Sequence, residues 1–129
     1  MEATAVERWT TSDWIPDVDL PEGRVGDWSV ERFTVSKDEA MFDAIRSLGR
    51  SVLPGTYTRL MRGRTVVMSD TPAEKRDHMG AVRRAEGDVL VAGLGLGMAV
   101  AAMLNRPEVR CVTVIEQAQE VIDLVAPTL

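Results

Sequence analysis

The amino-acid sequence predicts an α/β fold, in which the start of a doubly wound sheet follows a small region of a β-hairpin and helices. Residues 88–92 and 109–115 are almost wholly apolar, as strands are when helices cover both faces of a parallel sheet. A short helical segment separates them, so the order is strand, helix, strand, for which we expect a right-handed crossover. The turn after the first strand, "GLGLG" at 93–97, has glycine at alternate positions.

The N-terminal segment, residues 1–27, is predicted to be an extended arm. It contains two prolines, several acids and two tryptophans, Trp9 and Trp14, with neither a helical nor a strand period. Disordered tails are usually poor in aromatic residues. We therefore expect the tryptophans to pack on another surface.

The middle part, residues 28–86, is predicted to be a small hairpin and helix region. The stretch "WSVERFTVS" at 28–36 alternates apolar and polar residues, which is typical of a strand. Ser36 and Glu39 then form an S-x-x-E capping box, the usual start of a helix. This helix is expected to end near Leu48, because a glycine follows.

A hairpin and a second helix complete this middle part. Residues 55–70 contain two β-rich runs around Gly63, which supplies the turn. Thr71 and Glu74 form a second capping box, with a proline at the first helical position. The helix is predicted to run to about Ala85.

The third part, residues 87–129, is predicted to be a truncated half-domain. Its elements are, in order, a strand at 88–92, a helix from Gly97 to about Leu104, a strand at 109–115 and a helix from near Gln117. A sheet of this kind with only two strands has free edges, and free edges pair readily with another chain. We therefore expect a homodimer through the exposed edge of this sheet.

The charge of the chain disfavours nucleic acid as a partner. Its 129 residues include 15 Lys and Arg against 20 Asp and Glu, which gives a formal net charge of −5. Binding to a duplex depends on the neutralisation of phosphates by basic side chains. A membrane is also not expected as a partner, because no apolar run approaches the roughly 20 residues that a span requires.

Cys111 is the only cysteine, and it lies between an arginine and a valine in a predicted strand. One cysteine provides neither an internal disulfide nor a zinc site, so we predict no metal centre and a buried, inert thiol. The absence of a disulfide framework favours a reducing compartment. The N-terminus is acidic and does not resemble a signal peptide, so we expect a cytoplasmic protein.

Gly93, Gly95 and Gly97 lie between a predicted strand and a predicted helix. Glycine lets the backbone turn tightly and lets a ligand approach it, and a helix N-terminus presents free N–H groups. Glu116 ends the next strand, 19 positions after Gly97, where a carboxylate can accept hydrogen bonds from both hydroxyls of a ribose. These residues predict a site for an adenosine-containing ligand. The alternative is that the glycines serve only the turn.

The spacing of the glycines distinguishes between classes of nucleotide site. The dinucleotide fingerprint G-x-G-x-x-G/A would end at Met98 when counted from Gly93, and at Val100 when counted from Gly95. Neither register fits, which argues against NAD and FAD. A P-loop is excluded because no G-K-[ST] follows the glycines.

The segments "VLVAGLGLG" and "VTVIE" resemble the first two motifs of class I S-adenosylmethionine-dependent methyltransferases, which have a Rossmann-like fold. The resemblance implies that the glycines hold the methionine end of S-adenosylmethionine and that Glu116 holds its ribose. The order of the elements is also similar to that of spermidine synthase-like proteins, in which a hairpin and a histidine-bearing helix precede the glycine motif. The resemblance covers about residues 55–126, which correspond to the N-terminal half of such a protein.

The sequence departs from these families at several positions. Val91 stands where many methyltransferases carry an acid, and Leu96 stands where spermidine synthases have an Asp. Only Glu74 and His78 match the upstream D-E-x-x-Y-H-E signature of spermidine synthases. The resemblance therefore implies methyl transfer, with aminopropyl transfer from decarboxylated S-adenosylmethionine as the alternative. His78 is expected either to adjoin the ligand or to be an ordinary helix-surface residue.

The predicted function is that of an S-adenosylmethionine-binding, methyltransferase-like protein in fragmentary or reduced form, with an unidentified methyl acceptor. Complete class I domains have a seven-stranded sheet, whereas this sequence reaches only the second strand. Two alternatives stay open: a non-catalytic interaction or structural protein that retains the fold, and a fragment of an NAD-dependent oxidoreductase. No catalytic residue can be named, and the predicted cofactor-binding residues are Gly93, Gly95, Gly97 and Glu116.

Overall fold

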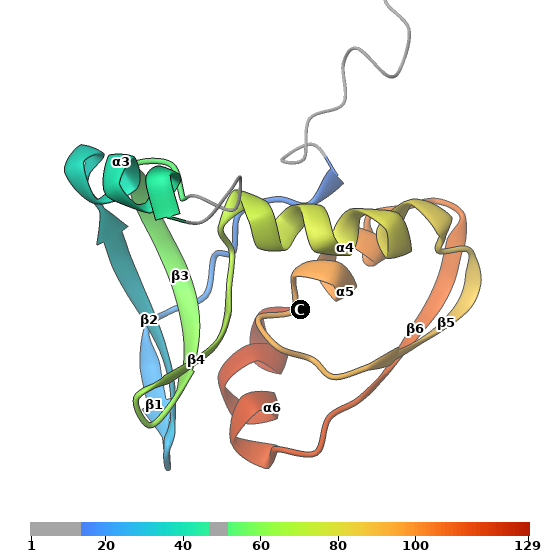
Figure 1. Cartoon of the computed structure of the whole chain (residues 1–129). Coiled ribbons are helices and arrows are strands. Elements are labelled where there is room, and N and C mark those ends of the chain that lie inside the picture. Colours follow the sequence, from blue (N-terminus) through green and yellow to red (C-terminus); the bar gives the residue numbers. More distant parts are fainter. Residues whose placement is uncertain (1–13, 47–51) are drawn as a thin grey trace, which may run out of the picture.

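The computed structural model describes residues 14–46 and 52–129, which form a mixed α/β structure (Figure 1). An antiparallel sheet in the order β1-β2-β3-β4 consists of β1 (Gly23–Val25), β2 (Trp28–Val35), β3 (Gly55–Arg62) and β4 (Thr65–Ser69). A parallel pair consists of β5 (Gly87–Ala92) and β6 (Val109–Ile115). The helices of these ranges are α3 (Lys37–Arg46), α4 (Pro72–Arg84), α5 (Met98–Leu104) and α6 (Gln119–Val125), followed by the 3-10 helix Ala126–Thr128.

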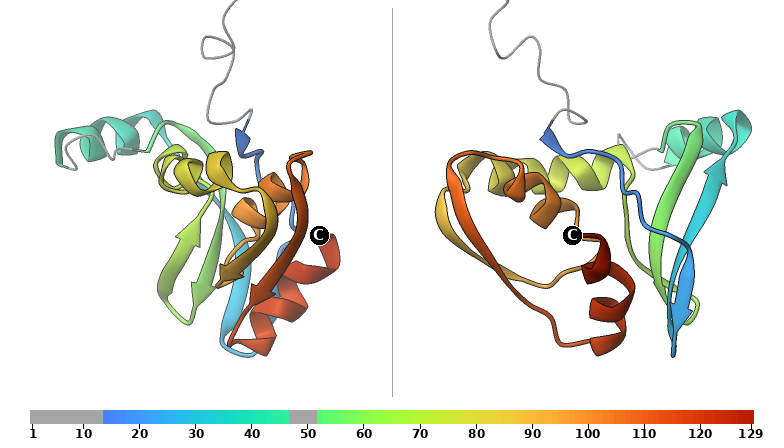
Figure 2. Two further views of the ribbon diagram at one scale, coloured as in Figure 1. Left: turned by 90° about the vertical axis from the view of Figure 1, so that its right-hand side faces the viewer. Right: turned by 180° about the vertical axis from the view of Figure 1, so that it is seen from behind.

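The two sheets lie on opposite sides of the molecule, with α4 and α5 between them (Figure 1 and Figure 2). One hydrophobic core joins these parts. Its buried side chains come from the N-terminal segment, the antiparallel sheet, α4 and the residue after it, α5, α6 and the loop after β5: Ile15, Leu20, Val30, Leu60, Val82, Ala85, Leu94, Leu96, Met98, Val100, Ala102, Met103, Val121 and Val125. The loop after β5 is therefore held by packing against both halves of the molecule.

The predicted hairpin is present as β3 and β4. Gly63 lies in its turn with φ at 59°, a left-handed conformation that glycine adopts without steric cost. A shorter hairpin, which the sequence analysis did not predict, joins β1 to β2 through Gly26 and Asp27. β1 thus falls within the segment that was expected to be an extended arm.

The first predicted capping box is present, and the second is not. Glu39 accepts a hydrogen bond from the Ser36 N–H at 2.9 Å and donates its own N–H to the Ser36 hydroxyl at 3.1 Å. Thr71 makes no side-chain cap to α4. The Glu74 carboxylate instead accepts from the N–H and hydroxyl of Ser69, at 3.0 and 2.8 Å. Ser69 ends β4 beside the helix, so its two donors compete successfully for this carboxylate. The predicted end of α3 near residue 48 lies outside the described residues.

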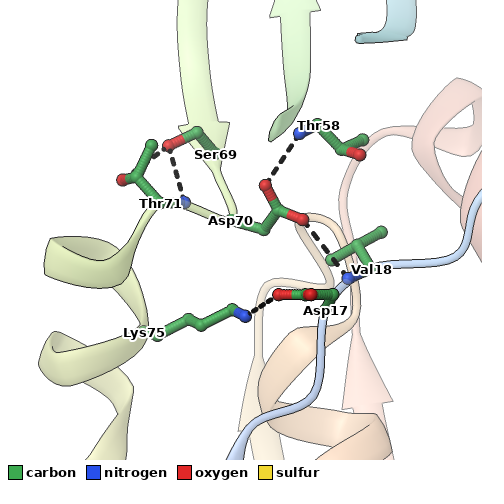
Figure 3. A network of polar contacts seen from close by, with 7 residues as sticks. All are labelled: Asp17, Val18, Thr58, Ser69, Asp70, Thr71 and Lys75. Carbon is green, nitrogen blue, oxygen red and sulfur yellow. Dashed lines mark hydrogen bonds and ion pairs between the residues drawn. The ribbon is translucent and has the colours of Figure 1, made fainter. Parts of the chain in front are cut away.

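A buried polar network ties the N-terminal segment to the antiparallel sheet and α4 (Figure 3). The Asp70 carboxylate accepts from the Thr58 N–H at 2.7 Å and from the Val18 N–H at 3.3 Å. Lys75, which is only 5% exposed, forms an ion pair with the exposed carboxylate of Asp17. We call the set Asp17, Val18, Thr58, Asp70 and Lys75 the polar clasp. It fixes the path of the chain before β1.

Tyr57 lies on β3 beside the polar clasp. Burial raises the pKa of its hydroxyl above the ordinary value of 10.0, and the negative charges of Asp70 and Asp17 raise it further. The hydroxyl is therefore protonated at neutral pH and donates to the Leu53 carbonyl at 2.7 Å. Its role is to hold the chain that enters β3.

Of the two tryptophans in the predicted arm, the structure describes Trp14, which packs against the core. The guanidinium groups of Arg83 and Arg106 lie over its ring, at 5.8 and 5.5 Å from the centroid. Arg106 also donates to the carbonyls of Val82 and Ala85, the latter at 2.8 Å. Arg106 therefore links the end of α4 to the N-terminal segment. Trp9 lies outside the described residues.

The parallel pair β5–β6 with α5 between its strands confirms the predicted order of strand, helix, strand. Val89 lies opposite Val112, and both pack against the core. On the other face, Leu90 is 66% and Ile115 61% exposed. The prediction that both faces are covered is therefore wrong for the described part of the chain. Cys111 shares this outer face and is exposed, so the prediction of a buried thiol is also wrong.

Candidate functional site

The glycine loop, residues 93–97, connects β5 to α5 and alternates between two kinds of residue. Gly93, Gly95 and Gly97 have φ angles of 92°, 54° and 76°, all in the region that side chains of L-residues rarely adopt. Leu94 and Leu96, between them, are 7% and 2% exposed. The leucines anchor the loop in the core, and the glycines provide its unusual backbone.

The three glycines have different surroundings. A Cβ on Gly97 would lie 3.1 Å from Val125 and 3.3 Å from Leu129, so these side chains would have to shift by a few tenths of an ångström to accept it. A Cβ on Gly95 would overlap the sulfur of Met68. A Cβ on Gly93 would meet no atom within 4 Å. Of these three glycines, Gly93 alone leaves open space beside the backbone.

Glu116 follows β6 and binds the glycine loop through its carboxylate. Oε2 accepts from the Leu94 N–H at 2.8 Å, and Oε1 accepts from the Ala118 N–H at 3.1 Å. The Gly93 N–H donates to the Ile115 carbonyl at 2.7 Å and so extends the parallel ladder. A carboxylate offers about four lone-pair positions. Glu116 thus keeps capacity for further donors after it has fixed the loop.

Three cavities adjoin the glycine loop in the described part of the chain: a small one of about 190 Å³ is lined by Leu96 and Gly97, and two larger ones are lined by Gly93 and Gly95. The first of the larger two, which we call the Glu116 cavity, has a volume of about 410 Å³ and is lined by Trp28, Leu60, Val67, Gly93, Gly95, Ile115, Glu116, Gln117 and Val121. The second, the His78 cavity, has a volume of about 580 Å³ and lies toward α4 and α5. Both volumes fall in the range of about 300–1,000 Å³ that is typical of ligand pockets. Val67, Gly93 and Gly95 line both cavities.

The His78 cavity is mainly apolar, with two polar side chains from α4. Glu74 and His78 are four residues apart and therefore lie on one face of the helix. The Glu74 carboxylate is engaged by Ser69. His78 is half-buried and lines the same cavity as Gly93 and Gly95. The structure thus brings the histidine to the glycine loop, on the side away from Glu116.

Met68 is a residue of this site that the sequence analysis missed. Its Sδ accepts a hydrogen bond from the Leu96 N–H at 3.2 Å, and its side chain lines the His78 cavity. A methionine in a predicted strand has no sequence signature that separates a loop contact from ordinary core packing.

No group of three potential metal ligands occurs among the residues that the structure describes. Within the same ranges, no helix combines the length and the apolar character needed to cross a membrane.

Comparisons of the chain with protein-family models, with curated proteins and with solved structures give no significant match.

Proposed function

We propose that the chain binds S-adenosylmethionine at the glycine loop, as the ligand-binding part of a Rossmann-like methyltransferase. The observation that carries this proposal is the position of Glu116. Its carboxylate is fixed by the Leu94 N–H at 2.8 Å and lines the Glu116 cavity together with Gly93. A half-buried carboxylate with unused acceptor positions, beside an open backbone segment, suits the two hydroxyls of a ribose.

The surroundings of the cavity also fit an adenosine-containing ligand. Trp28, Leu60 and Val121 supply apolar surface, and pockets for such ligands combine apolar walls with a few placed polar groups. Gly93 allows a ligand to approach the main chain. In this proposal Glu116 orients the ribose, and the glycine loop receives the methionine end.

The chemistry that S-adenosylmethionine supplies is a methyl group on a sulfonium, with aminopropyl transfer from its decarboxylated form as the alternative. The role of this chain is then to bind and orient the donor, since transfer depends on an in-line approach in a site that excludes water. We assign no catalytic base among the described residues. The methyl acceptor is unidentified.

A second candidate function is that of an interaction protein which keeps the fold without the chemistry. The outer face of the β5–β6 pair favours it, because Leu90 and Ile115 are exposed there. Each of these strands has one hydrogen-bonded neighbour within the described part of the chain. We propose a homodimer through this sheet edge. A concentration series by light scattering tests the dimer, which a constant monomer mass would contradict.

The cellular location that we propose is the cytoplasm. Cys111 is exposed and is the sole cysteine. An exposed thiol without an internal partner suits a reducing compartment.

Titration calorimetry on the whole chain tests the proposed function. We expect S-adenosylmethionine and S-adenosylhomocysteine to bind and NAD not to bind. Glu116→Gln should weaken binding by about 1–3 kcal/mol, because a polar pair at a partly buried group is lost. Glu86→Gln is the matched control, since Glu86 is exposed and lines neither cavity.

Three results would contradict the assignment. Unchanged affinity in Glu116→Gln would remove Glu116 from the ribose position. No binding of either sulfur ligand by the wild-type chain would favour the interaction protein, whereas binding of NAD alone would favour the oxidoreductase alternative. A thermal melt with each ligand supplies a second readout, because ligand at 100 times its Kd adds about 2.7 kcal/mol to stability.

A further inference from the structure

Met68 places its thioether on the middle of the glycine loop. Its sulfur accepts the Leu96 N–H and occupies the position that a side chain on Gly95 would need. Gly95 lines both the Glu116 cavity and the His78 cavity. Met68 therefore covers the loop where the two cavities meet.

An irregularity in β4 aims this side chain at the loop. Leu60 of β3 pairs with Met68, whereas the next residue of β3, Met61, pairs with Val66. Val67 is thus an additional residue in β4. A β-bulge of this kind bends the strand and redirects a side chain, and bulges are frequent beside binding sites.

The contact is one that a ligand could replace. A thioether sulfur is only a weak hydrogen-bond acceptor, so an oxygen atom of a ligand would satisfy the Leu96 N–H better. Methionine is unbranched and adapts its shape readily. Met68 also lines the His78 cavity of about 580 Å³, which offers space for the displaced side chain.

We propose that Met68 is an internal competitor for the glycine loop, which a ligand must displace to bind. This inference rests on the proposed function, because it assumes that the ligand occupies the loop. The apparent affinity is then reduced to the extent that Met68 covers the loop. Met68 also selects the ligand, which must present a carboxylate or hydroxyl oxygen to the Leu96 N–H in place of the sulfur.

Calorimetry on the full chain with S-adenosylhomocysteine and S-adenosylmethionine tests the competition. Met68→Ala should bind more tightly than wild type, by about tenfold if the loop is uncovered in a tenth of wild-type molecules. Met68→Leu keeps the bulk and lacks the acceptor, so its affinity should lie between the two. Met41→Ala is the matched control, because Met41 is 67% exposed on α3.

Hydrogen exchange without ligand tests the contact independently. The Leu96 amide should exchange faster in Met68→Ala than in wild type, because it loses its acceptor. The Gly93 amide, bonded to the Ile115 carbonyl at 2.7 Å, should keep its wild-type rate and so report an intact fold. An unchanged Leu96 rate would overturn the proposal.

The outcomes separate this inference from the proposed function. If wild type binds and Met68→Ala binds equally or more weakly, Met68 is not a competitor, and the proposed function stands. If only Met68→Ala binds, both are supported. If neither chain binds, the proposed function fails and the competition fails with it.

Discussion

The two sheets differ in the groups that hold them in place. All buried polar and charged residues of the described chain lie between Ser29 and Lys75, in or beside the antiparallel sheet. The parallel pair buries apolar side chains on one face and leaves Leu90 and Ile115 exposed on the other. Buried polar groups need specific partners, whereas apolar burial is not directional. The antiparallel half is therefore held by a buried polar network. The glycine loop is held by packing and by three hydrogen bonds, to the Glu116 carboxylate, the Ile115 carbonyl and the Met68 sulfur.

The largest effect is expected at Asp70, in the polar clasp. Asp70→Ala removes a buried acceptor of two backbone N–H groups, from Thr58 and Val18, and should lower the free energy of unfolding by about 2–4 kcal/mol. Urea denaturation measures this loss. Asp88→Ala is the control in the parallel pair, because Asp88 forms an exposed ion pair with Arg110 and should cost no more than about 1 kcal/mol. Equal losses would contradict the contrast between the sheets.

A smaller effect is expected at Gly95. Gly95→Ala combines a φ of 54° with an overlap on Met68, and should cost about 1–3 kcal/mol of stability. Gly93→Ala, at a φ of 92°, has no neighbour within 4 Å, so its cost should come from backbone strain alone and should not change when Met68 is truncated. Thermal denaturation compares the two variants.

A double-mutant cycle sharpens this prediction. In a Met68→Ala background the overlap at Gly95 is gone, and Gly95→Ala should cost only the backbone strain. If the two substitutions were additive, the loop and Met68 would not be in contact.

Most elements of the fold could be predicted because their determinants are local. The Gly63 turn, the Ser36 and Glu39 capping box and the apolar strands are each encoded within a few residues. β1 was not predicted because its three residues, which precede the turn at Gly26, are too few to show an alternation of apolar and polar side chains. The second capping box failed because Ser69, two residues before the helix boundary at Thr71, offered the Glu74 carboxylate better donors.

The candidate site could be predicted only in part, because only some of its determinants lie close together in the sequence. Glycines and an acid at fixed spacing indicate a nucleotide loop, and the sequence places Gly93 and Glu116 in that pattern. The contact of Met68 with the Leu96 N–H joins residues 28 positions apart and has no motif. Which face of β5–β6 is covered depends on what packs there, so the exposure of Cys111 could not be predicted from an apolar run.

The smallest effect is expected on the outer face of the parallel pair. Leu90→Lys places a charge on a side chain that is 66% exposed, and stability should change by no more than about 0.5 kcal/mol. Val91→Lys, the neighbour whose partly buried side chain packs against the core, should cost several times more. Both are measured by urea denaturation of dilute protein, so that association does not contribute. A large loss in Leu90→Lys at low concentration would mean that this face is covered within a single chain. Loss of a dimer, with the monomer equally stable, would instead mean that the face is covered by a second copy.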